Sequence, residues 1–133
     1  MIVVDASALA AALGQDGSFG GRARERLRGE TLVAPELIDL EVAAALRRLS
    51  LGGRLPVARA ELALLDLLRL PLRRLAHRPL IGRCWELRDN LTVYDAAYVA
   101  LAEGLRSTLV TADARLAKAP GPCCEVELVS ASA

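Results

Sequence analysis

The chain of 133 residues is 53% hydrophobic and 25% charged, which excludes an intrinsically disordered protein and supplies ample apolar material for a core. A formal net charge of +1 gives no sign of nucleic-acid binding through overall charge, although the basic residues are sixteen arginines and one lysine. Three cysteines without a Cys-x-x-Cys pair argue against a disulfide framework or a zinc site, and no apolar stretch is long enough for a membrane span, so we expect a cytoplasmic protein.

Short β-branched runs alternate along the chain with longer amphipathic segments. Strands are expected at residues 2–5, 31–35, 72–77, 107–111 and 124–129. Helices are expected at residues 8–13, 20–29, 35–53, 55–70, 79–89, 92–103 and 113–119. Ser7 is the expected N-cap of the first helix, Pro35 suits the first turn of the third, and Gly104 is expected to end the sixth.

The alternation of strands and helices predicts an α/β fold, in a single domain over residues 1–133. The expected architecture is a three-layer α/β/α sandwich around a mostly parallel five-stranded sheet. For five strands we expect the common order of the flavodoxin kind, with the first strand in a central position and right-handed crossovers. In such open sheets, ligands bind beyond the carboxyl ends of the strands.

Four acidic residues fall at that edge of the predicted sheet. Asp5 is the last residue of the first expected strand, and Asp113 follows the fourth by two residues. Two of the predicted helices also start at this edge, and they carry Glu41 in a second turn and Asp95 in a first turn. The helix neighbours of Glu41 three and four residues away are all apolar, which places its carboxylate on or beside the core-facing side.

Each of these acids also has a purely structural interpretation. Asp95 fits a capping box with Thr92, and Asp113 suits the N-cap of the last helix. Asp5 can serve as a turn carboxylate, and Glu41 can pair with a distant arginine. Their joint placement favours one functional site, because four carboxylates in a pocket repel one another unless a cation is bound. Mg²⁺ prefers carboxylate oxygens and keeps positions for water and a substrate phosphate, as hydrolysis of a phosphodiester requires.

Four segments in register carry a resemblance to a known family: VVDASAL, PELIDLEVAAALRR, LTVYDAAYVALAE and LVTADARLAKA. They resemble the PIN-domain ribonucleases, more specifically the VapC-type toxins of bacterial toxin–antitoxin pairs. The resemblance implies a PIN-like fold and an endoribonuclease that hydrolyses RNA with Mg²⁺ or Mn²⁺. It assigns four acids to catalysis and metal binding, which are Asp5, Glu41, Asp95 and Asp113. Ser7 and Thr111 match small hydroxyl positions that support such a site.

The same resemblance implies protein partners, namely a second copy of the chain in a homodimer and a small antitoxin whose tail lies across the toxin. The predicted helices over 36–51 and 55–69 carry more apolar residues than one buried stripe needs, and we expect the excess to serve the dimer or the antitoxin. The main alternative is a PIN-like module that binds RNA or protein without nuclease activity. A signalling receiver fits poorly, because the third expected strand is not followed by a phosphoacceptor aspartate.

Three further features remain open from sequence alone. The basic run RARERLR, residues 22–28, is a solvated face, a surface for partner binding or a set of phosphate contacts. His77, the single histidine, has no serine or cysteine partner that would make a nucleophilic site, so we expect it to be structural or on the surface. Trp85 is expected in the core or at an interface, with stacking on RNA as the lesser alternative.

Overall fold

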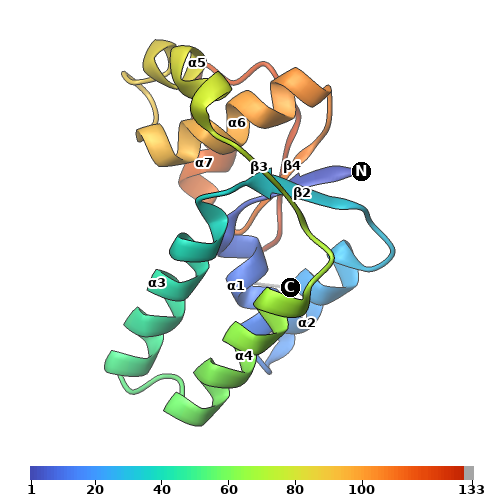
Figure 1. The fold of residues 1–133 in the computed structure, drawn as a ribbon, viewed down its shortest axis with the longest axis vertical. Helices are drawn as coiled ribbons and strands as arrows, with labels where there is room; N and C mark the ends of the chain where they lie inside the picture. Colours follow the sequence, from blue (N-terminus) through green and yellow to red (C-terminus); the bar gives the residue numbers. More distant parts are fainter. Residues whose placement is uncertain (131–133) are drawn as a thin grey trace.

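A five-stranded parallel sheet lies between two groups of helices in the computed structural model of the protein, which describes residues 1–130 (Figure 1). The strands are β1 Ile2–Val4, β2 Leu32–Pro35, β3 Arg73–Leu75, β4 Leu109–Thr111 and β5 Val126–Leu128. The helices are α1 Ala6–Gly14, α2 Ser18–Leu27, α3 Ile38–Leu51, α4 Val57–Arg69, the 3₁₀ helix η1 Arg78–Leu80, α5 Ile81–Glu86, α6 Val93–Leu105 and α7 Ala114–Lys118. The last three positions of the expected 1–133 domain lie outside the described residues.

The strand order is β3-β2-β1-β4-β5, and every neighbouring pair is parallel. The predicted α/β/α sandwich with five parallel strands is therefore confirmed, with α1 to α4 on one side of the sheet and α5 and α6 on the other (Figure 1). The first strand is central as expected, but the flavodoxin order is wrong. After β3 the chain returns through α6, which packs on β1 and β2, and this return places β4 beside β1.

The core sits around the central strands and α6. Val3, Val4 and Val110 have no exposed surface, as expected for strands covered on both faces. Seven consecutive residues of α6, from 96 to 102, are buried, which explains why its sequence is apolar on all sides. Because packing fixes the central strands and α6, the residues that follow these strands or begin this helix have defined positions. None of the helices in residues 1–130 has the length and apolar character needed to cross a membrane.

Three of the expected element boundaries are wrong for identifiable reasons. Ser7 lies inside α1, because the Asp5 carboxylate is the cap that accepts a hydrogen bond from the Ala8 N–H. Pro35 ends β2 instead of starting a helix, since the next N–H still donates to a β3 carbonyl and delays α3 to Ile38. Gly104 lies within α6, which continues to Leu105 and is capped by Arg106 in the left-handed conformation with φ of 53°.

Candidate active site

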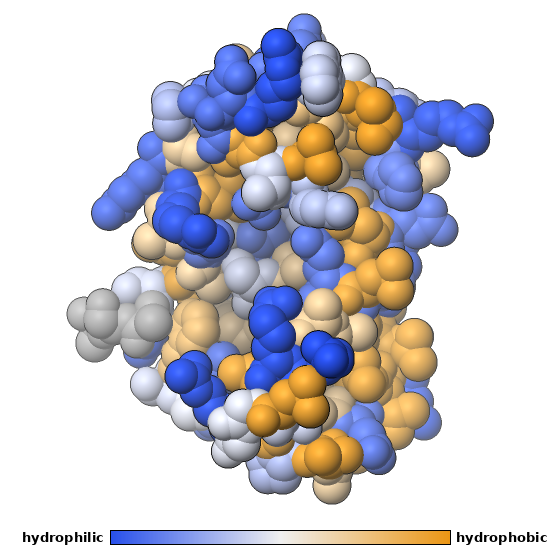
Figure 2. Space-filling model, turned by 90° about the vertical axis from the view of Figure 1, so that its left-hand side faces the viewer, coloured by the Kyte–Doolittle hydropathy of each residue, from blue (hydrophilic) through white to orange (hydrophobic). Residues whose placement is uncertain are grey.

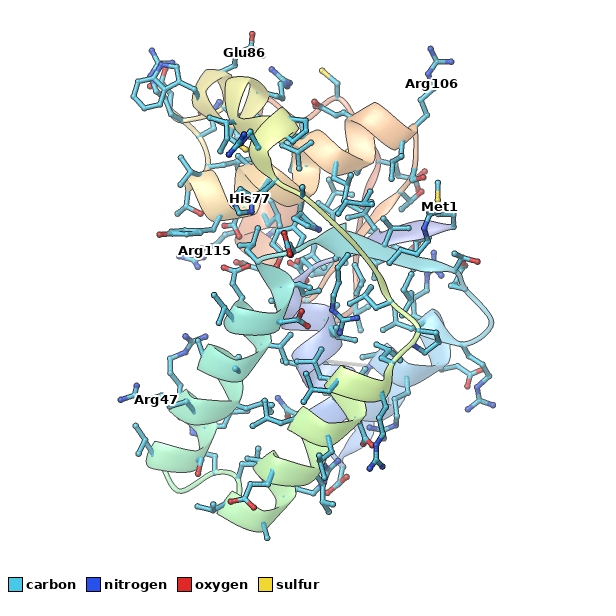
Figure 3. All side chains as sticks on the ribbon, viewed as in Figure 1. Met1, Arg47, His77, Glu86, Arg106 and Arg115 are labelled. Carbon is cyan, nitrogen blue, oxygen red and sulfur yellow. The ribbon has the colours of Figure 1, made fainter. Side chains whose placement is uncertain are left out.

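The four predicted acids meet at one cavity of about 200 Å³, which Ser7 also lines. Asp5 follows β1, and Asp113 caps α7 just after β4. Asp95 lies in the first turn of α6, and Glu41 lies in the first turn of α3, one turn earlier than expected because α3 begins later. Figure 3 shows carboxylate oxygens gathered where these helices approach the sheet, beside the labelled Arg115. The predicted convergence at the carboxyl edge of the sheet is therefore present in the structure.

Asp5 is the most deeply buried of the four carboxylates, with 4% of its surface exposed. Its Oδ1 accepts hydrogen bonds from Ser7 Oγ at 2.7 Å and from the Ala8 N–H at 3.0 Å. Its Oδ2 accepts one from Thr111 Oγ1 at 2.5 Å. Burial raises the pKa of Asp5 from 3.8 to about 6, since desolvation outweighs the opposing effect of these hydrogen bonds. The carboxylate is thus held in place at a cost in electrostatic free energy.

The hydroxyls of Ser7 and Thr111 connect the loop after β4 to Asp5. Ser7 Oγ accepts a hydrogen bond from the Ala112 N–H at 2.9 Å, and Thr111 Oγ1 accepts one from the Asp113 N–H at 3.0 Å. Each hydroxyl donates to Asp5, so the positions of Asp5 and Asp113 are coupled. This arrangement is what a supporting role for the two hydroxyls requires.

Glu41 is oriented by a tyrosine that the sequence analysis did not identify as part of the site. The Tyr98 hydroxyl donates a hydrogen bond of 2.6 Å to Glu41 Oε1, and the tyrosine is 1% exposed. Burial raises the pKa of Glu41, although this hydrogen bond favours its charged form. The signal in the sequence was a tyrosine three residues after Asp95, within a run of small and aliphatic residues over 96–102. A buried phenol needs an acceptor, and Glu41 supplies it.

Replacing Tyr98 by Phe is expected to lower the free energy of unfolding by about 1 kcal/mol and to weaken whatever activity depends on Glu41. The reason is that the ring stays packed while Glu41 Oε1 loses its only side-chain donor among the residues described. Urea unfolding measures the first effect. The control is Tyr94→Phe, because Tyr94 is 60% exposed. Equal effects of the two substitutions would contradict the orienting role of Tyr98.

Asp95 and Asp113 face each other across the cavity. Burial, followed by repulsion from Asp113, raises the pKa of Asp95. The Thr92 hydroxyl accepts a hydrogen bond of 3.1 Å from the Asp95 N–H, so the threonine half of the expected capping box is present. Asp113 does cap α7, because its Oδ1 accepts a bond of 2.9 Å from the Arg115 N–H. Its Oδ2 lies 3.5 Å from the Arg115 guanidinium. The expected N-cap role of Asp113 is therefore confirmed, and the same residue lines the cavity.

The charge balance of the cavity fits a hard divalent cation. Within residues 1–130, Asp113 is the only one of the four acids in an ion pair, and Arg115 has 92% of its side chain exposed. The other three carboxylates all have raised pKa values. Oxygen donors of this kind suit Mg²⁺ or Mn²⁺. In the side-chain positions of this structure, however, no three Asp, Glu, His or Cys residues in the described part of the chain lie close enough together to hold a metal ion.

Comparison with known proteins identifies the family, since residues 2–122 match the PIN domain. The chain belongs to the PIN domain family. A VapC ribonuclease of Mycobacterium bovis, Mb0985, is 46% identical over 97% of this chain and 98% of its own length. Ribonuclease VapC12 of Mycobacterium tuberculosis is 42% identical over 98% of this chain and the whole of its own.

Solved structures share the fold of this PIN domain. PAE2754 from Pyrobaculum aerophilum superposes with a TM-score of 0.66 and 29% identity, covering 87% of this chain and 83% of that one. VapC20 of Mycobacterium tuberculosis, described as a toxin that cleaves the sarcin-ricin loop, superposes with a TM-score of 0.69 and 18% identity, covering 88% of this chain and 93% of that one. At 18% identity, the similarity to VapC20 shows a shared fold and nothing further.

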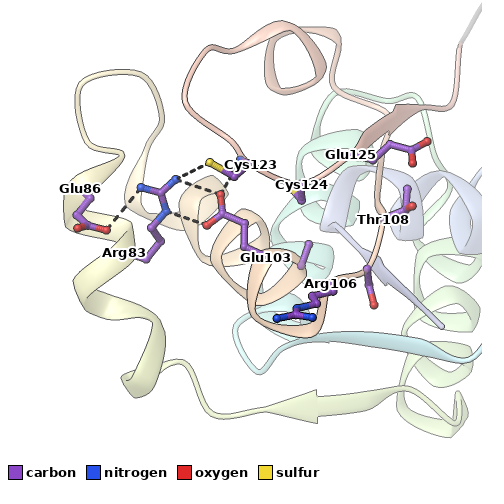
Figure 4. Close-up of a pocket in the computed structure, with 10 residues that line it drawn as sticks. Arg83, Glu86, Glu103, Arg106, Thr108, Cys123, Cys124 and Glu125 are labelled. Carbon is purple, nitrogen blue, oxygen red and sulfur yellow. Dashed lines mark hydrogen bonds and ion pairs between the residues drawn. The ribbon is translucent and has the colours of Figure 1, made fainter.

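A larger cavity of this PIN domain, of about 600 Å³, lies at the opposite end of α6 from Asp95 (Figure 4). Two of its charged side chains, Arg83 and Glu103, are paired with each other. Arg83 Nε donates to Glu103 Oε1 at 2.8 Å, and Glu103 Oε2 accepts from the Cys123 N–H at 2.7 Å. The Glu103 pKa is lowered by the hydrogen bonds from Arg83. These contacts connect α5 and α6 to the segment before β5, and the cavity contains none of the predicted site residues.

The features left open by the sequence are placed away from the acidic cavity. The guanidinium of Arg24 donates to the carbonyls of Ala12 and Gln15, and Arg26 pairs with Glu30 and Glu127, so α2 uses basic side chains to hold the fold together. His77 is exposed, as expected. Trp85 is 63% exposed, with the Arg88 guanidinium 4.7 Å from its ring centre, so the core interpretation of Trp85 is wrong.

Proposed function

We propose that this protein is a metal-dependent endoribonuclease that hydrolyses RNA phosphodiester bonds as the toxin of a VapC-type toxin–antitoxin pair. The observation that carries the proposal is the meeting of four carboxylates from separate elements in one cavity, three of them with raised pKa values. Relatives that cover nearly the whole chain are named as VapC ribonucleases, which supports the same activity. A PIN-like module that only binds RNA or protein does not require a pocket in which four carboxylates repel one another.

The residues proposed to hold Mg²⁺ or Mn²⁺ are Asp5, Glu41, Asp95 and Asp113. A divalent cation bound there would supply a water of lowered pKa and stabilise charge that develops on the phosphate oxygens. Asp5 would remain fixed by the hydroxyls of Ser7 and Thr111. Glu41 would orient the attacking water through the oxygen that Tyr98 does not engage.

Removal of divalent metal is the direct test of this function. We expect the purified chain, free of antitoxin, to cleave RNA when Mg²⁺ or Mn²⁺ is added and to lose that cleavage in EDTA, because the carboxylates have no other counter-charge sufficient for the reaction. The measurement is product formation from a panel of structured RNAs on denaturing gels. Cleavage that continues in EDTA would contradict the metal mechanism, and RNA binding without any cleavage would support the non-nuclease alternative.

Exposed apolar side chains on α3 and α4 are the proposed contacts for protein partners. They are Leu40, Leu51, Val57, Leu62, Leu65 and Leu68, each between 46% and 78% exposed. Leu40 is the most exposed, and with Tyr94 it lines a mainly apolar hollow of about 260 Å³ next to Glu41. We propose that this hollow belongs to a homodimer interface and that the α4 leucines contact the antitoxin.

The isolated chain is expected to elute from a sizing column near 28 kDa, twice the 14.2 kDa of one chain. Leu40→Glu should shift it to the monomer, because burying a carboxylate in an apolar interface is costly. Light scattering on the eluate gives the mass directly. Leu68→Glu is the matched control on α4, at 71% exposure, and should leave the dimer intact. A monomeric wild-type chain would contradict the dimer.

A further inference from the structure

Arg48 is the one cationic side chain that lines the acidic cavity in the described part of the chain. It lies on α3, seven residues after Glu41, so it is on the same side of the helix two turns further along. Ala44 and Ala45, which lie between them, also line the cavity and leave the space beside Arg48 open. The guanidinium is therefore placed at the entrance to the acids by the geometry of one straight helix.

The charge of Arg48 is not taken up by an ion pair. In residues 1–130 no salt bridge or side-chain hydrogen bond involves it, and its positive charge acts on Glu41 through a longer-range attraction. Arg115, the other arginine near the acids, is paired with Asp113 and also attracted to Asp95. Many of the remaining arginines are likewise engaged, as with Arg74 to Asp39 at 2.7 Å. Arg48 therefore keeps its five donors available to a ligand.

RNA binding at this cavity requires a positive charge, which Arg48 can supply. A phosphodiester is an anion, and a pocket of four carboxylates repels it. Metal ions neutralise the carboxylates, but the phosphates next to the cleaved bond require positive charge of their own. A guanidinium binds a phosphate through two parallel hydrogen bonds, which fixes orientation as well as position. Figure 2 shows that the face carrying α3 is hollowed across its middle, with hydrophilic side chains on both sides of the hollow.

We infer that Arg48 is a substrate-binding residue that holds an RNA backbone phosphate at the entrance to the acidic cavity. The inference rests on the proposed ribonuclease function and adds a residue to it. Arg48 sets where the strand enters, because α3 is fixed by the buried Ile38, Val42 and Leu46. The contact is to the backbone, so it positions the RNA without reading its sequence.

The first test measures RNA binding without catalysis. Arg48→Ala is compared with Arg47→Ala by fluorescence anisotropy of a short labelled single-stranded RNA in EDTA. Arg47 directly precedes Arg48 on the same helix, is exposed and lies outside the cavity lining. It is labelled on the outer side of α3 in Figure 3, so it controls for the loss of one positive charge. We expect Arg48→Ala to weaken binding about tenfold and to reduce the salt slope by about 0.7, and Arg47→Ala to change both much less.

A double-mutant cycle separates phosphate binding from simple neutralisation of Glu41. If Arg48 only balances that carboxylate, Arg48→Ala has no effect on RNA binding in a Glu41→Gln background. If Arg48 holds a phosphate, the loss of about tenfold persists in that background. Arg48→Lys keeps the charge without the paired donors, so partial recovery of affinity is expected.

Kinetics on an RNA that the wild-type chain cleaves complete the test. Arg48→Ala is expected to raise KM about tenfold with a smaller change in kcat, as removal of a contact made in both ground and transition states does. Equal binding by the Arg48→Ala and Arg47→Ala variants would overturn the inference, as would an effect that disappears with Glu41→Gln. A wild-type chain that binds RNA but never cleaves it would overturn the proposed function, while the binding comparison would still decide the role of Arg48.

Discussion

Asp95→Asn is expected to reduce RNA cleavage by about 10³-fold or more, equivalent to a loss of at least about 4 kcal/mol of transition-state stabilisation. A neutral amide is a poor ligand for a hard cation, and the substitution leaves the shape of the cavity unchanged. Asp89→Asn makes the same chemical change at an exposed aspartate outside the cavity and should cleave like the wild-type chain. Initial rates at saturating Mg²⁺ or Mn²⁺ provide the comparison.

The stability of the Asp95→Asn variant decides between the functional and the structural interpretation of this residue. The backbone N–H of residue 95 still donates to the Thr92 hydroxyl after the substitution, so the cap of α6 is retained. Removal of a partly buried charge that faces Asp113 should leave the metal-free thermal midpoint unchanged or higher. A strongly lowered midpoint together with retained cleavage would show that Asp95 serves the helix and not the reaction.

The architecture could be predicted because the hydrophobic pattern specifies it. Continuous apolar runs at β1 and β4, with longer amphipathic segments between the strands, are consistent with a doubly covered parallel sheet and with little else. The strand order could not be read in the same way. The strand order depends on where α6 packs. Because the sequence of α6 is apolar on all sides, it does not indicate which strands the helix covers.

The candidate site was predictable to the extent that it lies at element ends. Asp5 and Asp113 follow strands, and parallel strands present their carboxyl ends at one edge. What the sequence could not provide is the contacts across the cavity. The bond from Tyr98 to Glu41 joins residues 57 positions apart, and the bond from Thr111 to Asp5 joins residues 106 apart. Such pairings depend on the packed tertiary structure, as does the difference between Arg48 and Arg47.

The metal-free protein is expected to lose stability as the pH rises from about 4 to about 7, owing to Asp5. The folded-state pKa of Asp5 is about 6 against an ordinary value of 3.8, so the folded protein binds more protons than the unfolded chain in this range. Stability therefore falls with rising pH through that window and is level above it. The shift corresponds to about 3 kcal/mol, because one pKa unit is about 1.4 kcal/mol. Glu41 and Asp95 add in the same direction, since their pKa values are also raised.

Other groups oppose this trend, so the measurement has to isolate Asp5. Glu103 has a pKa lowered by Arg83, and its contribution to stability is present at neutral pH and lost as the pH falls through that lowered pKa. The difference in unfolding free energy between Asp5→Asn and the wild-type chain, measured by urea titration in EDTA at each pH, cancels such contributions. That difference should shift in favour of Asp5→Asn by about 3 kcal/mol from about pH 4 to about pH 7. The hydrogen bonds lost by the amide change its value at every pH but not its slope. A difference independent of pH would mean that the Asp5 carboxylate is not strained, and the central reason for expecting a cation in this cavity would be gone.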